Sequence, residues 1–302
     1  MILKKDNIVI SCSKGKNTFQ LIRILKKIKE FEIYSTDINN INSNNKKFFS
    51  NLGTQNKDYL SNLIENFKEN NINKFIPLAD EEVLHISKNI DIFKKNKIKV
   101  FCNKYKNILI LNNKVNTLRF LEKNKIPIPK WKVFKNLSEY KKSLEFFFDK
   151  NLEIVIKPII SRGNRNINYF SKRSYIKIIN NYLKFKKNFF INEKLYPKYY
   201  DIDLFSKRIS IKNNIIIRQN LNPLNPTVYR GFKFISDKKI MSFCNIINNK
   251  LKNEFILDVD AMTDINNNVK VIEVNSRPSG AFIYSLIKNL QLKNEFIKYL
   301  KK

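Results

Sequence analysis

VKVIEVNSRPSG, residues 269–280, is the stretch of sequence that decides the fold. Its β-branched residues predict a strand over 269–275. Glu273 and Asn275 are two residues apart, so both side chains project from the same face of that strand. Both side chains supply oxygen ligands. Arg277 follows on the loop, where a guanidinium group is well placed to hold an anionic reaction intermediate.

A second strand is predicted just upstream, over residues 257–262, and a turn at 264–268 joins the two strands as an antiparallel pair. Asp258 and Asp260 show the same spacing of two residues, and strand pairing brings Asp260 near Glu273. Oxygen-only clusters of this kind suit Mg²⁺, which is usually shared with substrate phosphates. Taken alone, the pattern fits an ordinary hairpin with a solvated polar face equally well.

A basic segment lies in the middle of the chain. The apolar run 154–156 predicts a buried strand that ends at Lys157, where a lysine can meet a phosphate group. The loop that follows contains Arg162, Gly163 and Arg165 and adds backbone N–H donors. This is the composition of a flap over nucleotide phosphates, although it lacks the GxxxxGK[ST] pattern of a Walker loop. A lysine at a strand end is more often simply exposed, so this signal is weak by itself.

A third segment has the makeup of an adenine pocket. The apolar strand predicted over 189–195 ends in Glu193, Lys194 and Leu195. Such a strand end can offer backbone N–H and C=O groups to the edge of a base. The pattern is common, and it indicates a nucleotide only in combination with the other two segments.

The first part of the chain alternates strands with helices. Strands are predicted at 8–10, 31–36 and 74–78, and helices at 21–28 and 60–67. This alternation is typical of a parallel sheet with helices on its faces. Residues 1–110 are therefore expected to form a small open α/β domain.

The rest of the chain is divided into a lid at 111–188 and a C-terminal part at 189–302 that carries the metal site. A helix is predicted at 114–124, where the prolines that follow end it. Ser138 is predicted to cap the next helix. Further strands are expected at 200–206, 208–212 and 215–218, and a helix from about Ala281. The fold class is α/β, with α+β character in the C-terminal part.

Composition narrows the classes of function. The chain has 302 residues with 43% hydrophobic content, which favours a folded protein with a sizeable core. No apolar run reaches the ~18 residues that a membrane span needs. The three widely spaced cysteines form no CxxC pair, so reduced thiols and a cytoplasmic location are expected. The single histidine excludes chemistry that needs two histidines.

The formal net charge of +32 has two explanations. Clustered Lys and Arg side chains bind nucleic acid or acidic membranes by displacing counterions. Here the lysines occur singly and in pairs along the whole chain, mixed with Asn, which is typical of AT-rich coding. Nucleic acid is therefore not the expected partner, although a positive surface would still attract ATP and anionic substrates.

The order and spacing of these segments resemble the ATP-grasp superfamily, and most of all the branch that contains the carbamoyl-phosphate synthase large chain and related carboxylate–amine ligases. The likeness covers residues 110–290, and the first 110 residues also resemble the N-terminal α/β domain of that family. The segments that carry the likeness are 113–129, 155–158, 162–165, 192–195, 258–260 and 272–280.

The resemblance implies ATP and two Mg²⁺ ions as cofactors, with Mn²⁺ as a substitute. Lys114 would contact the α-phosphate, and Lys157 would bridge the α- and β-phosphates. The flap residues Arg162, Gly163 and Arg165 would cover the triphosphate, and Glu193, Lys194 and Leu195 would line the adenine pocket. Asp260 and Glu273 would bind magnesium, with Asn275 on the second ion. Arg277 would steady the transferred phosphoryl group, so Arg277 and Lys157 are the expected catalytic residues.

The sequence departs from the family pattern at the nucleotide sugar. Tyr199 stands where the family usually has a ribose-binding glutamate, so the ribose contact either falls to Asp201 or Asp203 or is lost. The acid substrate would be recognised by Arg218, Arg230, Ser279 and Gly280. For each arginine, ordinary surface charge explains the sequence equally well.

The predicted function is an ATP-dependent ligase that activates a carboxylate as an acyl phosphate for attack by an amine or thiol. The partners are then small-molecule carboxylate and amine substrates, and a homodimer is compatible with the sequence. Two alternatives stay open: an ATP-grasp kinase whose phosphoryl group remains on a small-molecule acceptor, and a basic nucleic-acid-binding module. The sequence identifies neither the acid nor the amine.

Overall fold

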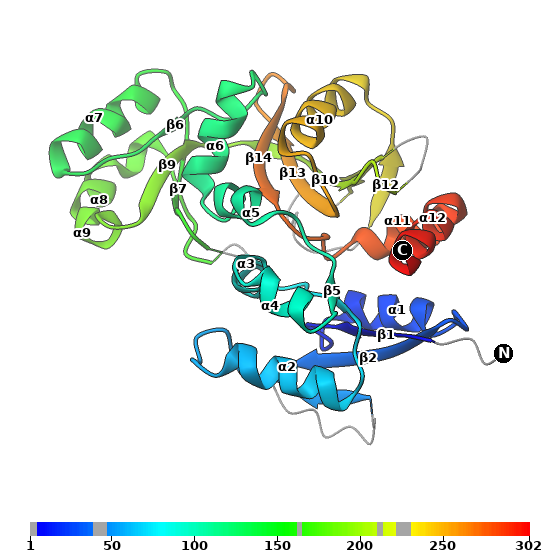
Figure 1. Ribbon diagram of the computed structural model, residues 1–302. Helices are drawn as coiled ribbons and strands as arrows, with labels where there is room; N and C mark the ends of the chain where they lie inside the picture. The colour runs from blue at the N-terminus through cyan, green and yellow to red at the C-terminus, as the bar shows by residue number, and fades with distance from the viewer. Residues whose placement is uncertain (1–4, 39–46, 162–164, 210–213, 222–230) are drawn as a thin grey trace.

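The computed structural model describes residues 5–38, 47–161, 165–209, 214–221 and 231–302. The chain forms three sheets with helices packed around them (Figure 1). The N-terminal sheet lies at the bottom of the view, the middle sheet at the upper left, and the C-terminal sheet at the upper right. The α/β class predicted from the sequence is confirmed.

The N-terminal sheet has the strand order β3-β2-β1-β4-β5, and every neighbouring pair is parallel. The alternation of strands and helices therefore predicted this sheet correctly. Its strands are β1 (Asp6–Ile10), β2 (Phe31–Asp37), β3 (Phe48–Ser50), β4 (Lys74–Ile76) and β5 (Lys99–Val100), and its helices are α1 (Lys16–Leu25), α2 (Tyr59–Glu69), α3 (Asp80–Lys88) and α4 (Ile90–Lys95).

The middle sheet has the order β6-β9-β7-β8, and all of its pairs are antiparallel. It consists of β6 (Trp131–Lys132), β7 (Ile154–Pro158), β8 (Asn168–Phe170) and β9 (Phe189–Glu193), and it is covered by α7 (Leu137–Phe148), the 3₁₀ turn η1 (Lys172–Ser174), α8 (Tyr175–Asn180) and α9 (Tyr182–Phe185). β9 pairs with β7, so Phe189–Glu193 lies in the same sheet as the strands of the predicted lid, whose predicted boundary is residue 188.

Two helices begin at asparagine residues whose side chains cap them. Asn113 caps α6 (Lys114–Lys123), and its side chain accepts a hydrogen bond from the backbone N–H of Asn116 at 3.0 Å. Asn136 caps α7 in the same way, by accepting from the backbone N–H of Glu139 at 2.9 Å. The predicted cap Ser138 was wrong, because it already lies in the first turn of that helix.

The C-terminal sheet is antiparallel, in the order β12-β11-β10-β13-β14. Its strands are β10 (Tyr196–Phe205), β11 (Ile215–Asn220), β12 (Phe232–Ile235), β13 (Ile256–Thr263) and β14 (Val269–Asn275), with α5 (Tyr105–Leu111) and α10 (Lys238–Leu251) as further helices. The hairpin of β13 and β14 agrees with its prediction. The strand predicted at 208–212 is wrong at residues 208 and 209, which form a turn and a bend, and 210–212 lie outside the described residues.

The last two helices, α11 (Phe282–Lys288) and α12 (Leu290–Lys301), join the two ends of the chain. Their buried side chains Phe282, Phe296 and Leu300 belong to the same hydrophobic cluster as Ile8 of β1 and Leu21 of α1. The shared core holds the N-terminal sheet beside the loop that follows β14 (Figure 1). None of the helices in the described ranges has the length and apolar character to cross a membrane.

Candidate active site

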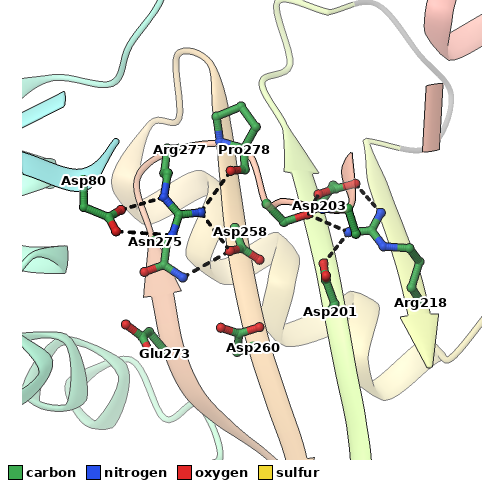
Figure 2. Close-up of polar contacts among 12 residues, drawn as sticks. Asp80, Asp201, Asp203, Arg218, Asp258, Asp260, Glu273, Asn275, Arg277 and Pro278 are labelled. Carbon is green, nitrogen blue, oxygen red and sulfur yellow. Dashed lines mark hydrogen bonds and ion pairs between the residues drawn. The ribbon is translucent and has the colours of Figure 1, made fainter. Parts of the chain in front are cut away.

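The oxygen-bearing side chains of β13 and β14 lie directly opposite one another. Asp260 pairs with Glu273, and Asp258 pairs with Asn275. Cross-strand neighbours of an antiparallel pair on one face have Cβ atoms about 4.5–5.5 Å apart. The sequence prediction that Asp260 lies near Glu273 is therefore confirmed, and Figure 2 shows the two carboxylates side by side.

These side chains form part of a polar row that crosses four strands. From β11 to β14, the row consists of Arg218, Asp201, Asp260 and Glu273, each paired with the next. One end of this row is a buried ion pair and the other end opens into a cleft. The sequence showed the spacing of two within each strand, but only the register of all four strands shows the row.

The donors on β13 and β14 fit a divalent cation. All of them present oxygen, and the buried Oδ1 atom of Asp258 has no hydrogen-bond partner in the described structure. Burial and then the neighbouring Glu273 raise the pKa of Asp260 to about 7. Burial and then Asp260 raise the pKa of Asp258 well above its ordinary value. A bound cation relieves this repulsion, because it favours the ionised forms of both acids.

Among the described residues, no group of three His, Cys, Asp or Glu side chains already forms a metal cage. Two of the predicted ligands instead have partners within the protein. Glu273 accepts a hydrogen bond from Lys114, and Asp260 accepts one from the hydroxyl of Tyr199. The donor set thus fits the ion, and each of these contacts engages one carboxylate oxygen, Oε1 of Glu273 and Oδ1 of Asp260.

Lys157 is the predicted phosphate-binding lysine at the end of β7, and it is only 9% exposed. No hydrogen bond or ion pair of Lys157 occurs within the described ranges, where its Nζ atom lies 5.4 Å from the centre of the Phe190 ring. Burial lowers its pKa to about 8, although Glu273 and Asp260 oppose that shift. An unpaired buried cation is costly, so this group favours an anionic ligand.

Lys114 connects the lid to the metal-binding hairpin. Its Nζ atom donates to the backbone carbonyl of Ser161 at 3.0 Å and forms an ion pair with Glu273. Its side chain is 8% exposed. Ser161 immediately precedes the predicted flap, so Lys114 links the base of the flap to the acid of β14.

A cleft of about 540 Å³ brings most of the predicted residues together. Its walls come from the lid on one side and from β13 and β14 on the other. The predicted site residues that line it are Lys114, Lys157, Glu193, Leu195, Asp260, Glu273, Asn275, Arg277 and Gly280. Residues not predicted to bind a ligand also line it, among them Asp80, Val155, Ile167, Tyr169, Asn192, Tyr199, Asp258 and Met262.

Glu193 lines the cleft and is held in place by hydrogen bonds. Its two carboxylate oxygens each accept from Lys270 Nζ at 3.1 Å, and Oε2 also accepts from the backbone N–H of Lys130 at 3.0 Å. Lys194 does not line the cleft, because its ammonium group pairs with Glu153 at 2.6 Å. The predicted adenine segment thus contributes Glu193 and Leu195 to the wall, and the Lys194 side chain belongs elsewhere.

Arg277 joins the N-terminal sheet to the acidic hairpin. Its Nε atom lies 2.7 Å from Asp80 Oδ1, and its Nη1 atom lies 3.5 Å from Asp258 Oδ2 (Figure 2). Burial opposes the charged form, but Asp80 and then Asp258 raise the pKa of the guanidinium above its ordinary value. Arg277 therefore stays charged at the edge of the cleft.

Arg218, Asp201 and Asp203 form a buried cluster of charges. Arg218 is 1% exposed and forms ion pairs with both aspartates, and its Nη2 atom lies 2.9 Å from the hydroxyl of Ser279 (Figure 2). Asp203 is 0% exposed and also accepts a hydrogen bond from Ser285 at 2.7 Å. In this conformation the charges of Arg218, Asp201 and Asp203 neutralise one another. Their predicted contacts to ribose and substrate stay a prediction.

Two further cavities adjoin the cleft at the N-terminal sheet. One of about 380 Å³ shares Asp80, Lys114, Glu273 and Asn275 with it, and Arg165 of the predicted flap lines this cavity. The other, of about 360 Å³, is lined by residues from the turn after β1 and from the loop after β14, including Cys12, Asn17, Thr18, Arg165, Arg277, Ser279 and Gly280. The predicted residues Arg162, Gly163 and Arg230 lie outside the described residues.

Sequence reasoning missed Asp80 as the partner of Arg277 and Lys270 as the partner of Glu193. Both contacts join segments far apart in the chain, and a single sequence carries no signal for such pairs. Tyr199 was noticed only as a departure from a family pattern, and its hydrogen bond to Asp260 was not foreseen. The spacing of Asp258 was recognised, but its place beside Arg277 was not.

Comparison with known proteins adds the last observation. No protein-family model matches the sequence, and no curated protein sequence matches it. Solved structures do match. An L-amino acid ligase from Bacillus licheniformis superposes with a TM-score of 0.68 at 13% identity, over 99% of this chain and 75% of that one.

Two other enzymes superpose equally well. D-alanyl-alanine synthetase A from Vibrio cholerae gives a TM-score of 0.68 at 10% identity, over 99% of this chain and 98% of that one. A biotin carboxylase from Campylobacter jejuni, solved as a complex with an ATP analogue, gives 0.71 at 10% identity, over 99% and 71%. The three sheets, their order along the chain and these superpositions together show that the chain has the ATP-grasp fold.

Proposed function

We propose that the protein is an ATP-dependent ligase that activates a carboxylate as an acyl phosphate for attack by an amine. The observation that carries this proposal is that a buried lysine and two clustered acids line one cleft. Lys157 is a buried cation without an ion pair in the described structure, and it faces the clustered acids Asp260 and Glu273. A metal-bound triphosphate satisfies both sides at once, because its phosphates neutralise the lysine and its metal neutralises the acids.

The residues divide between the parts of the nucleotide. Lys114, Lys157 and the flap arginine Arg165 would hold the phosphates. Two magnesium ions, or manganese ions in their place, would be held by Asp260, Glu273 and Asn275, and they would supply charge compensation for the transferred phosphoryl group. The unpredicted acid Asp258 lies next to these ligands in the cleft and is a further candidate.

The base would lie at the opposite end of the cleft, where apolar side chains predominate. Val155, Ile167 and Leu195 line that end, and the backbone of 193–195 offers hydrogen-bonding groups to the edge of adenine. Glu193 is held by Lys270 and Lys130, so this wall is rigid before any ligand arrives. A preformed wall lowers the entropic cost of binding the base.

The acid substrate would enter the 360 Å³ cavity beside Arg277. That cavity shares Asp80, Arg277 and Gly280 with the cleft, so a carboxylate bound there lies next to the phosphate end. Its oxygen attacks the γ-phosphorus, the bond from that phosphorus to the bridging oxygen breaks, and ADP leaves. An amine then displaces phosphate from the acyl carbon. Arg277 would stabilise negative charge in both steps.

The experiment is a screen for ADP release with pools of acids and amines in the presence of Mg²⁺. We expect release that needs both an acid and an amine. Glu273→Gln and Lys157→Ala should each abolish it while the fold survives. Lys198→Ala should not change it, because Lys198 is exposed and its ammonium group binds Asn267 in the described structure. Full activity of either cleft variant would reject the site.

The same screen separates the alternatives. A kinase would release ADP and leave a stable phosphorylated acceptor without any amine. A basic nucleic-acid-binding module would retain DNA or RNA binding in Glu273→Ala and would hydrolyse no nucleotide. The homodimer and the cytoplasmic location expected from the sequence are part of the proposal, and sedimentation of the active protein would test the dimer. The pools that support ADP release would identify the acid and the amine.

A further inference from the structure

Tyr199 on β10 lies beside the predicted metal site. Its hydroxyl donates a hydrogen bond to Oδ1 of Asp260, and its ring lines the cleft. In the sheet, Tyr199 pairs with Met262 of β13, two residues from Asp260 on the same face. The tyrosine thus approaches Asp260 from β10, whereas Glu273 approaches it from β14 on the other side of β13.

Three acids lie next to one another in the polar row, and they differ in what neutralises them. Asp201 is paired with Arg218, and Glu273 is paired with Lys114. Asp260 stands between them and forms no ion pair among the described residues. The donor that the described structure gives to its carboxylate is the neutral phenol of Tyr199.

A neutral donor and a cationic one have different consequences for metal binding. A lysine bound to Asp260 would compete with a metal for the negative charge. The phenol leaves that charge in place and orients the carboxylate by holding Oδ1, so Oδ2 remains for a ligand. Hydrogen-bonded partners of this kind typically change metal affinity 10- to 100-fold when they are removed.

We propose that Tyr199 is a positioning residue for the metal-binding carboxylate of Asp260 and that it is not a ligand of the nucleotide sugar. This inference rests on the proposed function, because it assigns the metal to Asp260. It goes beyond that function by giving a role to the tyrosine on β10. The hydroxyl holds Oδ1 of Asp260 from β10, which leaves Oδ2 for an ion shared with Glu273 of β14.

The test measures metal binding directly. Mn²⁺ is titrated into the protein in the presence of ADP and the free ion is followed by electron paramagnetic resonance, while calorimetry measures ADP binding without metal. Tyr199→Phe removes only the hydroxyl and should weaken Mn²⁺ binding about 10-fold or more while metal-free ADP binding stays unchanged. Tyr200→Phe is the matched control, since it removes a hydroxyl from the adjacent, buried residue on the opposite face of β10 and should leave both values unchanged.

A double-mutant cycle distinguishes positioning from a merely structural role. If Tyr199 acts through Asp260, then Tyr199→Phe in an Asp260→Asn background should cause no further loss of Mn²⁺ affinity. Wild-type affinity in Tyr199→Phe, or losses that simply add in the double variant, would overturn the inference while the ligase proposal stands. A wild-type protein that binds neither ADP nor Mn²⁺ would remove the proposed function and this inference with it.

Discussion

Arg277 is held by Asp80, a residue 197 positions earlier in the chain, through contacts of 2.7 and 3.3 Å to the two carboxylate oxygens. Asp80 begins α3 of the N-terminal sheet, and Arg277 lies in the loop after β14. The pair therefore fixes the proposed catalytic arginine to a different sheet from the one that carries the proposed metal ligands. Both residues line the cavity in which the acid substrate is expected.

The first prediction concerns this pair. Asp80→Asn removes the negative charge of the carboxylate and weakens the two hydrogen bonds that orient the guanidinium group of Arg277. We expect a loss of about 1–2 kcal/mol in unfolding free energy, between the values for exposed and buried pairs. The KM for the acid substrate should rise more than the KM for ATP. Urea unfolding and steady-state kinetics measure both effects.

Asp91→Asn is the matched control for that variant, because Asp91 pairs with Lys94 at 2.8 Å on an exposed helix surface. It should change neither stability nor kinetics measurably. Equal rises in both KM values for Asp80→Asn would argue against a role of Arg277 beside the acid.

The second prediction concerns the buried charges around Arg218. Arg218→Met leaves Asp201 and Asp203 buried without their cation, and breaking a buried pair in this way typically costs about 3–5 kcal/mol. We expect the thermal midpoint to fall sharply. Arg208→Met, which removes an exposed arginine bound to Glu254, should have little effect. A normal midpoint for Arg218→Met would show that water reaches these acids.

The third prediction concerns pH and stability without ligands. Burial and Glu273 raise the pKa of Asp260 in the folded state from its ordinary value of 3.8 to about 7. Between pH 4 and 7 the folded protein therefore keeps a proton that the unfolded chain has lost. Stability from this group is fully present below pH 4 and is lost as the pH rises toward 7. Asp260→Asn should flatten this part of the pH profile of the thermal midpoint.

The affinity for a metal–nucleotide ligand should change with pH in the opposite direction below about pH 8. Metal binding needs the ionised form of Asp260, so affinity for Mg²⁺–ADP should rise from pH 6 to pH 8. Lys157, whose pKa burial lowers to about 8, should weaken binding again at higher pH as it loses its charge. Calorimetry across this range should give a bell-shaped curve. A flat curve would contradict the pairing of Asp260 and Lys157 with one ligand.

The fourth prediction concerns the nucleotide sugar. Asp201 and Asp203 are bound to Arg218, and the hydroxyl of Tyr199 is bound to Asp260. We therefore expect dATP to support activity within about threefold of ATP. A carboxylate contact to the 2′-hydroxyl would contribute about 1.5–3 kcal/mol, or roughly 10- to 100-fold, so a preference of that size for ATP would contradict the prediction.

Much of the fold could be predicted from the sequence, because several elements follow from local patterns. The parallel sheet followed from apolar strands that alternate with helices, and the hairpin of β13 and β14 followed from two strands around a polar turn. Within that hairpin, the spacing of Asp258, Asp260, Glu273 and Asn275 placed four side chains on one face, as the register shows. These features are local, and local patterns are what a single sequence reports.

The relationships that a single sequence leaves open have a different origin. Whether Asp201, Asp203 and Arg218 bind a ligand or each other depends on the register between β10 and β11 and on the serines of the last segment. The partner of Arg277 depends on α11 and α12 packing against the N-terminal sheet. These are tertiary relationships, and neither periodicity nor capping signals contain them. Even the wrong cap at Ser138 was an error of only two positions.

The central claim is that Lys157 and the acids of β13 and β14 bind one metal–triphosphate between them. Isothermal titration of the protein with the magnesium complex of a non-hydrolysable ATP analogue tests it most directly. We predict one site per chain, a loss of roughly 10- to 100-fold in affinity for Lys157→Ala, and no change for Lys198→Ala. Equal affinity of Lys157→Ala and the wild-type protein, or binding that is indifferent to Mg²⁺, would contradict the account.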